Sequence, residues 1–99
     1  MNLNLLPDLA LFVQIVDQGS FSAVARQNGI TPSAVSRSVS RLEREMGCKL
    51  LQRTTRKLRL SDAGETIYQH AQQMLEAARQ AMDSAGSRQT VAQDRKSVV

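Results

Sequence analysis

The segment from Gly29 to Gly47 constrains the fold of this chain most strongly, because both of its ends carry residues that mark helix boundaries. Thr31 is suited to cap a helix N-terminus, and Pro32 loses no useful N–H at the first helical position. Gly47 suits the left-handed residue that follows a helix end. The segment therefore predicts one helix that begins after Thr31 and ends before Gly47.

The two faces of this expected helix differ in chemistry. Apolar residues recur at spacings of four, three and four and so share one helical face; they are Val35, Val39, Leu42 and Met46. The opposite face carries short hydroxyl side chains and arginines, namely Ser33, Ser36, Arg37, Ser40, Arg41 and Arg44. Hydroxyls and long cationic side chains suit close approach to phosphates and base edges. We therefore predict a DNA-recognition helix.

The positive charge of the chain is concentrated in one part of the sequence. The 99 residues carry a net charge of +4. Residues 31–60 hold eight basic and two acidic residues and have a net charge of +6, whereas the segments on either side each carry −1. Such asymmetry is typical of a nucleic-acid-binding surface, and an ordinary solvated face is the alternative.

The composition argues against several other classes of protein. Cys48 is the only cysteine and His70 the only histidine, so one chain can form neither an internal disulfide nor a zinc site of the usual Cys/His kind. No apolar run approaches the roughly 20 residues of a membrane span, and the N-terminus lacks the pattern of a signal peptide. No glycine-rich phosphate loop and no nucleophile paired with a base is evident. We expect a cytoplasmic protein that is not an enzyme and uses no cofactor or metal.

Two helices are expected before the recognition helix. The first begins either at Leu5 or at Pro7 and ends at Gln18. The second follows the N-cap Ser20 and closes at Asn28-Gly29. A short glycine-containing turn then leads into the recognition helix, and this arrangement is that of a helix-turn-helix.

Residues 49–60 are expected to form a β-hairpin. Leu58 and Leu60 alternate with Arg59, as in a strand with one buried face. The expected turn, Arg53-Thr54-Thr55-Arg56-Lys57, carries three cations and two hydroxyls. A hairpin with such a tip is expected to act as a wing that reaches a flanking minor groove or phosphates. An edge hairpin kept soluble by its charge is the alternative.

Residues 61–86 are expected to form a long amphipathic helix, with Ser61 as its N-cap. Small and apolar residues recur along it every three or four positions. They are Ile67, Ala71, Met74, Ala78, Ala81 and Ala85, with Leu75 and Met82 on a neighbouring line. A domain this small cannot cover a helix of about seven turns. We therefore expect the uncovered stripe to meet a second copy of the chain in a coiled-coil-like homodimer.

Several short motifs lie in order along residues 3–86. They are Phe21-Ser-Ala-Val-Ala25, Thr31-Pro-Ser-Ala-Val-Ser-Arg37, Arg41-Leu-Glu43, Gly47, Leu50-Leu-Gln-Arg53, Arg56 and Leu60-Ser-Asp-Ala-Gly64. Together they resemble the N-terminal DNA-binding domain of LysR-type transcriptional regulators. The resemblance implies a mainly α fold, in which a winged helix-turn-helix of three helices and a short β-hairpin (residues 1–60) precedes a linker and dimerisation helix (61–86). It also implies binding to promoter DNA as a dimer or tetramer.

The residue pattern and the resemblance give the expected contacts with double-stranded promoter DNA. On the recognition helix, which is expected in the major groove, they are Thr31, Pro32, Ser33, Ser36, Arg37, Ser40 and Arg41. On the wing, the resemblance implies Arg53 and Arg56 at the flanking backbone or minor groove, and we add Lys57 from its charge alone. This chain has Pro32-Ser33 where Gln-Pro is usual in the family, which leaves its base preference open.

The C-terminal end departs from the resemblance. Relatives carry a C-terminal domain that binds a small-molecule inducer, so an inducer is expected only if such a domain belongs to this protein. We expect residues 87–99 to be a disordered tail. The last six, Asp94 to Val99, match a translated sequencing adapter (gat-cgg-aag-agc-gtc-gtg), which predicts a truncated gene. A naturally short regulator with a disordered tail is the alternative.

Overall fold

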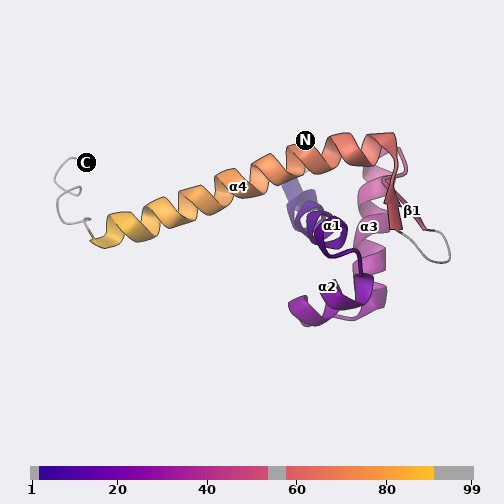
Figure 1. Cartoon of the computed structure of the whole chain (residues 1–99), viewed down its shortest axis with the longest axis horizontal. Coiled ribbons are helices and arrows are strands. Elements are labelled where there is room, and N and C mark those ends of the chain that lie inside the picture. The colour runs from indigo at the N-terminus through magenta and orange to yellow at the C-terminus, as the bar shows by residue number, and fades with distance from the viewer. Residues whose placement is uncertain (1–2, 54–57, 91–99) are drawn as a thin grey trace.

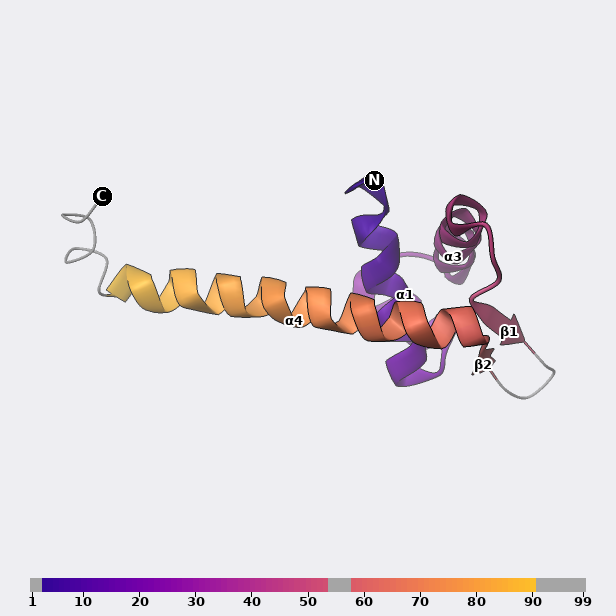
Figure 2. The same ribbon diagram turned by 90° about the horizontal axis from the view of Figure 1, so that it is seen from above.

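The computed structural model describes residues 3–53 and 58–90 and is mainly helical (Figure 1). A short 3₁₀ turn (Leu3–Leu5) is followed by α1 (Leu6–Gln18), α2 (Phe21–Asn28), α3 (Pro32–Met46), β1 (Leu51–Arg53), β2 (Leu58–Leu60) and α4 (Asp62–Thr90). The hairpin lies beside α3, and α4 runs past α1 so that only its second half extends away from the other elements (Figures 1 and 2). The predicted fold class, three helices with a two-stranded wing and a long last helix, is confirmed.

The ends of α1 and α2 follow from local signals. Helix α1 begins at Leu6, with Pro7 in its first turn and the 3₁₀ turn before it. The Ser20 hydroxyl caps α2 by accepting a hydrogen bond from the Ala23 N–H (3.1 Å). A glycine with positive φ ends each helix, at 67° for Gly19 and 68° for Gly29.

Helix α3 has the bounds that the sequence predicts. The Thr31 hydroxyl accepts a hydrogen bond from the Ala34 N–H (3.1 Å), and Pro32 is the first helical residue. At the other end, Gly47 has a φ of 74°. Met46 differs from the other members of the predicted apolar face because it is 39% exposed. It is the last helical residue and the chain turns at Gly47, so its side chain is only partly covered.

The hydrophobic core lies between α1, α2, α3 and the base of the hairpin. Its buried members are Phe12, Ile15, Val24, Ala25, Val35, Val39, Leu42, Leu50 and Leu51. Leu50 and Leu51 at the base of the hairpin belong to this core, so the base of the wing is packed against the helices.

The hairpin is antiparallel and pairs Leu51 with Leu60, Gln52 with Arg59 and Arg53 with Leu58. Because side chains alternate along a strand, Leu51 is buried while Gln52 and Arg59 are exposed on the outer face. The tip of the wing, residues 54–57, lies outside the described residues.

Helix α4 starts in close contact with the hairpin. The Ser61 hydroxyl accepts a hydrogen bond from the Gly64 N–H (2.9 Å), which confirms the predicted N-cap. The Ser61 N–H donates to the Leu50 carbonyl oxygen (3.0 Å). Gly64 lies directly against that carbonyl, and a Cβ at this position would be 2.2 Å from the oxygen. The start of α4 is thus fitted to the backbone at the base of the wing.

The end of α4 corrects one prediction. The helix continues to Thr90, so the expectation of a disordered tail over residues 87–99 was wrong for residues 87–90. A glycine inside a helix costs only about 1 kcal/mol relative to alanine, and no proline follows Gly86, so the helix passes through it. Residues 91–99, which include the adapter-like segment, lie outside the described residues.

Burial along α4 divides the helix in two. Ala71 is buried, and Ile67, Met74 and Leu75 are half-buried, because this part of α4 packs on α1. The Tyr68 hydroxyl also donates a hydrogen bond to Asp17 of α1. From residue 76 to residue 85 every side chain is exposed, and Met82 is 74% exposed. The second half of the predicted small-residue stripe is therefore uncovered in this single chain.

Candidate nucleic-acid interface

The outward face of α3 is a stripe of serines and arginines. Ser33, Arg37, Ser40 and Arg44 recur at spacings of four, three and four, and all four are exposed. The inward face of α3 consists of Val35, Ser38, Val39 and Leu42, which are buried. Packing of the inward face on α1 and α2 therefore turns the serines and arginines to solvent.

The structure brings the predicted residues of α3 together at one surface. Thr31 caps the helix and Pro32 opens it, and both are exposed, as are Ser33, Arg37, Ser40 and Arg41. Ser36 is half-buried on the flank of the stripe. Of the predicted wing residues, Arg53 closes β1 and is described by its backbone alone, while Arg56 and Lys57 lie outside the described residues.

Arg41 differs from the other arginines of α3 because it is tied to α1. Its Nε and Nη2 donate hydrogen bonds to the two carboxylate oxygens of Asp8, at 2.9 and 3.0 Å. The Ser38 hydroxyl donates to the same carboxylate. The Asp8 side chain is 4% exposed, whereas that of Arg41 is 54% exposed. One end of the Arg41 guanidinium is thus fixed to the interior while the residue still borders the outward stripe.

This cluster keeps the Asp8 carboxyl ionised. The hydrogen bond from Arg41 lowers the pKa of Asp8 more than burial raises it, and the hydrogen bond from Ser38 lowers it further. The same bond to Asp8 raises the pKa of the Arg41 guanidinium. The ion pair therefore links α1 to α3 throughout the neutral pH range.

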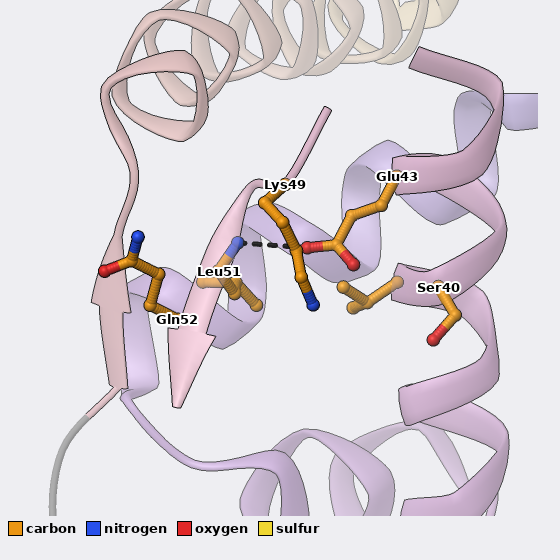
Figure 3. Close-up of a pocket in the computed structure, with 6 residues that line it drawn as sticks. Ser40, Glu43, Lys49, Leu51 and Gln52 are labelled. Atoms are coloured by element: carbon orange, nitrogen blue, oxygen red, sulfur yellow. Dashed lines mark hydrogen bonds between the residues drawn. The ribbon is translucent and has the colours of Figure 1, made fainter. Parts of the chain in front are cut away.

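Glu43 fixes the wing to α3. Its Oε2 accepts hydrogen bonds from the Leu50 N–H (2.8 Å) and the Leu51 N–H (3.1 Å), and Figure 3 shows the carboxylate reaching from α3 towards β1. These bonds satisfy two backbone donors at the base of the hairpin. They also fix the position of the wing relative to the recognition helix.

The exposed basic side chains of this surface are not neutralised by neighbouring acids. Among the described residues the ion pairs are Arg41–Asp8 and, on α4, Arg79–Glu76. The basic residues Arg37, Arg44, Lys49 and Arg59 are exposed and form no ion pair with a described residue. Their charge is therefore available to a polyanion.

Sequence reasoning missed two residues of this region. Asp8 stands 33 positions before its partner Arg41, and the only local signal was an acidic residue in the first turn of α1. Lys49 belongs to the basic block at residues 31–60, but nothing in the sequence showed that it faces α3.

Within residues 3–53 and 58–90, no group of three or more His, Cys, Asp and Glu side chains is placed to hold a metal ion. In the same part of the chain, no helix has both the length and the apolar character needed to cross a bilayer.

A basic recognition helix that follows a short glycine turn, with a hairpin wing fixed beside it, defines a winged helix-turn-helix DNA-binding domain. Residues 6–65 match the model of bacterial regulatory helix-turn-helix proteins of the LysR family. The chain therefore belongs to the LysR family of transcriptional regulators.

Known proteins similar to this chain are regulators or their DNA-binding domains. CrgA of Neisseria meningitidis serogroup C (strain 8013) is 48% identical over 70% of this chain and 23% of its own length. DmlR of Escherichia coli (strain K12) is 40% identical over 83% of this chain and 27% of its own length. The BenM DNA-binding domain, solved in complex with benA site 1 DNA, superposes with a TM-score of 0.76 at 30% identity, over 83% of this chain and 92% of that domain. The chain spans about a quarter of the length of the curated relatives it matches.

Proposed function

We propose that this chain is the DNA-binding unit of a LysR-type regulator and binds promoter DNA as a homodimer. The observation that carries the proposal is the exposed stripe of Ser33, Arg37, Ser40 and Arg44 on α3, with a wing anchored beside it by Glu43. A recognition helix of this kind enters the major groove with its N-terminal residues at the base edges. The solved complex of the similar BenM domain with DNA supports this arrangement.

In this proposal the recognition-helix residues divide by role. Arg37 and the hydroxyls near the N-terminus of α3 meet base edges, and Arg41, held by Asp8, meets the backbone. The wing residues Arg53, Arg56 and Lys57 meet the flanking backbone or minor groove. The unit acts without a cofactor or a catalytic residue, in the cytoplasm where promoter DNA is accessible. Any response to an inducer requires a further domain.

The first experiment separates base reading from phosphate contact. Duplexes selected from a random pool are compared with scrambled duplexes in titrations at several salt concentrations. We expect Arg37→Ala to lower the discrimination between them by about 1–3 kcal/mol, because a bidentate arginine contact to guanine is lost. We expect Arg56→Ala to weaken binding to both duplexes alike and to reduce the salt slope by about one.

The matched control is Arg79→Gln, which removes one positive charge from α4, away from α3. It is expected to leave the discrimination unchanged, and melting curves verify that each variant is folded. Equal effects of Arg37→Ala and Arg56→Ala on both duplexes would contradict the division of roles. Failure of the wild-type protein to enrich any sequence would contradict the proposed function.

The homodimer is proposed to form through the uncovered stripe of α4. Replacing both Ala78 and Met82 by glutamate places two charges on this stripe, so we expect the protein to become monomeric in analytical ultracentrifugation. Affinity for a selected duplex with two half-sites is expected to fall at least about tenfold, because the two units no longer bind together.

The control for this experiment replaces Gln73 and Gln80 by glutamate. Both are exposed, and at 100° per residue they lie on the face of α4 opposite the stripe. This variant carries the same added charge and is expected to remain a dimer. Dissociation of both variants to the same extent would indicate a general charge effect and would count against dimerisation through the stripe.

A further inference from the structure

A polar groove separates α3 from the first strand of the wing. It has a volume of about 520 Å³ and is lined by Val39, Ser40, Glu43, Lys49, Leu51 and Gln52. Figure 3 shows Lys49 reaching into the space between β1 and α3, with Ser40 on the α3 side. Both residues are exposed, and Lys49 forms no ion pair with a described residue. The groove thus offers an ammonium group and a hydroxyl to an incoming ligand.

The position of the groove points to one occupant. In a winged helix-turn-helix bound to DNA, the recognition helix lies in the major groove and the wing tip reaches the adjacent minor groove. A single sugar–phosphate strand separates two adjacent grooves, so this strand must cross the protein between α3 and the hairpin. The groove lined by Ser40 and Lys49 opens at that crossing.

Glu43 determines where in the groove an anion can lie. Its Oε2 is held at the inner side by the N–H groups of Leu50 and Leu51. An anion is repelled from this carboxylate and attracted by the Lys49 ammonium, so it is favoured at the outer end, near Ser40. The groove therefore suits a phosphodiester that passes across its mouth more than a free anion that enters fully.

We propose that Lys49 and Ser40 hold one phosphate of the strand that runs between the major groove read by α3 and the minor groove reached by the wing. Lys49 supplies the charge and Ser40 a hydroxyl donor, so the contact sets the register of the domain on the duplex without reading a base. This inference rests on the proposed DNA-binding function and adds Lys49 to the interface.

The test combines a protein variant with a neutralised phosphate. Lys49→Gln is titrated against selected and scrambled duplexes over a range of salt concentrations. We expect about a five- to tenfold loss of affinity for both and a reduction of the salt slope by about 0.9, the value for one phosphate contact. Methylphosphonate is then placed at successive positions of the selected duplex. At one phosphate between the two grooves, it is expected to weaken the wild-type protein but not Lys49→Gln.

The outcomes separate this inference from the proposed function. If the wild-type protein selects a sequence but Lys49→Gln keeps its affinity and salt slope, Lys49 holds no phosphate and the inference fails alone. If every methylphosphonate weakens Lys49→Gln as much as it weakens the wild type, the two changes are independent, and the inference fails in the same way. Arg79→Gln, the charge control, is expected to keep the wild-type salt slope. Replacing chloride by inorganic phosphate at constant ionic strength is expected to affect both proteins equally, and saturable inhibition of the wild type alone would indicate a site for free phosphate instead.

Discussion

Replacing Gly64 by alanine is expected to destabilise the fold by about 3 kcal/mol or more, although alanine favours a helix by about 1 kcal/mol over glycine. The added Cβ would lie 2.2 Å from the Leu50 carbonyl oxygen, 3.0 Å from the Leu50 carbonyl carbon and 3.1 Å from Cδ2 of Leu60. The leucine side chain can shift, but the backbone carbonyl is held by the Ser61 N–H (3.0 Å). Relief therefore requires α4 to move away from the base of the wing. Urea unfolding of the two proteins measures this loss.

The control for Gly64→Ala is Gly19→Ala. Gly19 has a φ of 67° but nothing within 4 Å of an added Cβ, so this variant reports backbone strain without a clash. Strain of this kind costs about 1–2 kcal/mol. We expect Gly64→Ala to be the less stable of the two. A Gly64→Ala protein as stable as the wild type would mean that α4 does not pack as closely on the wing as the structure indicates.

Asp8→Asn is expected to lower the free energy of unfolding at neutral pH by about 1–3 kcal/mol. The carboxylate accepts hydrogen bonds from Arg41 and from Ser38, and Ser38 is only 3% exposed. Arg41 can turn to water when the pair is broken, but the buried Ser38 cannot. The neutral amide offers one oxygen in place of two and carries no charge for the guanidinium.

The loss of unfolding free energy caused by Asp8→Asn is expected to depend on pH in a defined direction. The folded state lowers the pKa of Asp8 below its usual value of 3.8, so the unfolded chain binds the proton more readily. The ion pair thus contributes its full stability above that value and loses it as the pH falls through the lower, folded pKa. We expect the difference in unfolding free energy between wild type and Asp8→Asn, measured by urea unfolding, to become smaller below about pH 4.

Asp83→Asn is the control for the pH series, because it neutralises an exposed carboxylate on α4. It is expected to unfold like the wild type at each pH. If the difference in unfolding free energy between wild type and Asp8→Asn persists unchanged to pH 3, the Asp8 side chain stabilises the fold by its packing and hydrogen bonds and not by its charge.

The ends of most helices and the face that α3 turns to solvent were determined by the sequence itself. The caps Ser20, Thr31 and Ser61 form the hydrogen bonds expected of them. The reason is that a cap accepts hydrogen bonds from N–H groups within three residues, so the capping bond can form from the local chain alone. The same holds for the exposed stripe of serines and arginines on α3, since helical periodicity places residues spaced three and four apart on one face. The end of α4 was misjudged because one glycine is a weak local signal that helix propagation overrides.

Only the tertiary structure decided how these elements are joined. Gly64 reads as an ordinary position in the first turn of a helix, and its need for glycine comes from the Leu50 carbonyl. The pairing of Asp8 with Arg41 joins residues 33 positions apart, and the groove at Lys49 exists because Glu43 holds the hairpin against α3. These contacts depend on the packing of α1, α3 and the wing around a shared core. Periodicity and capping describe neighbours along the chain, so they carry no information about such distant contacts.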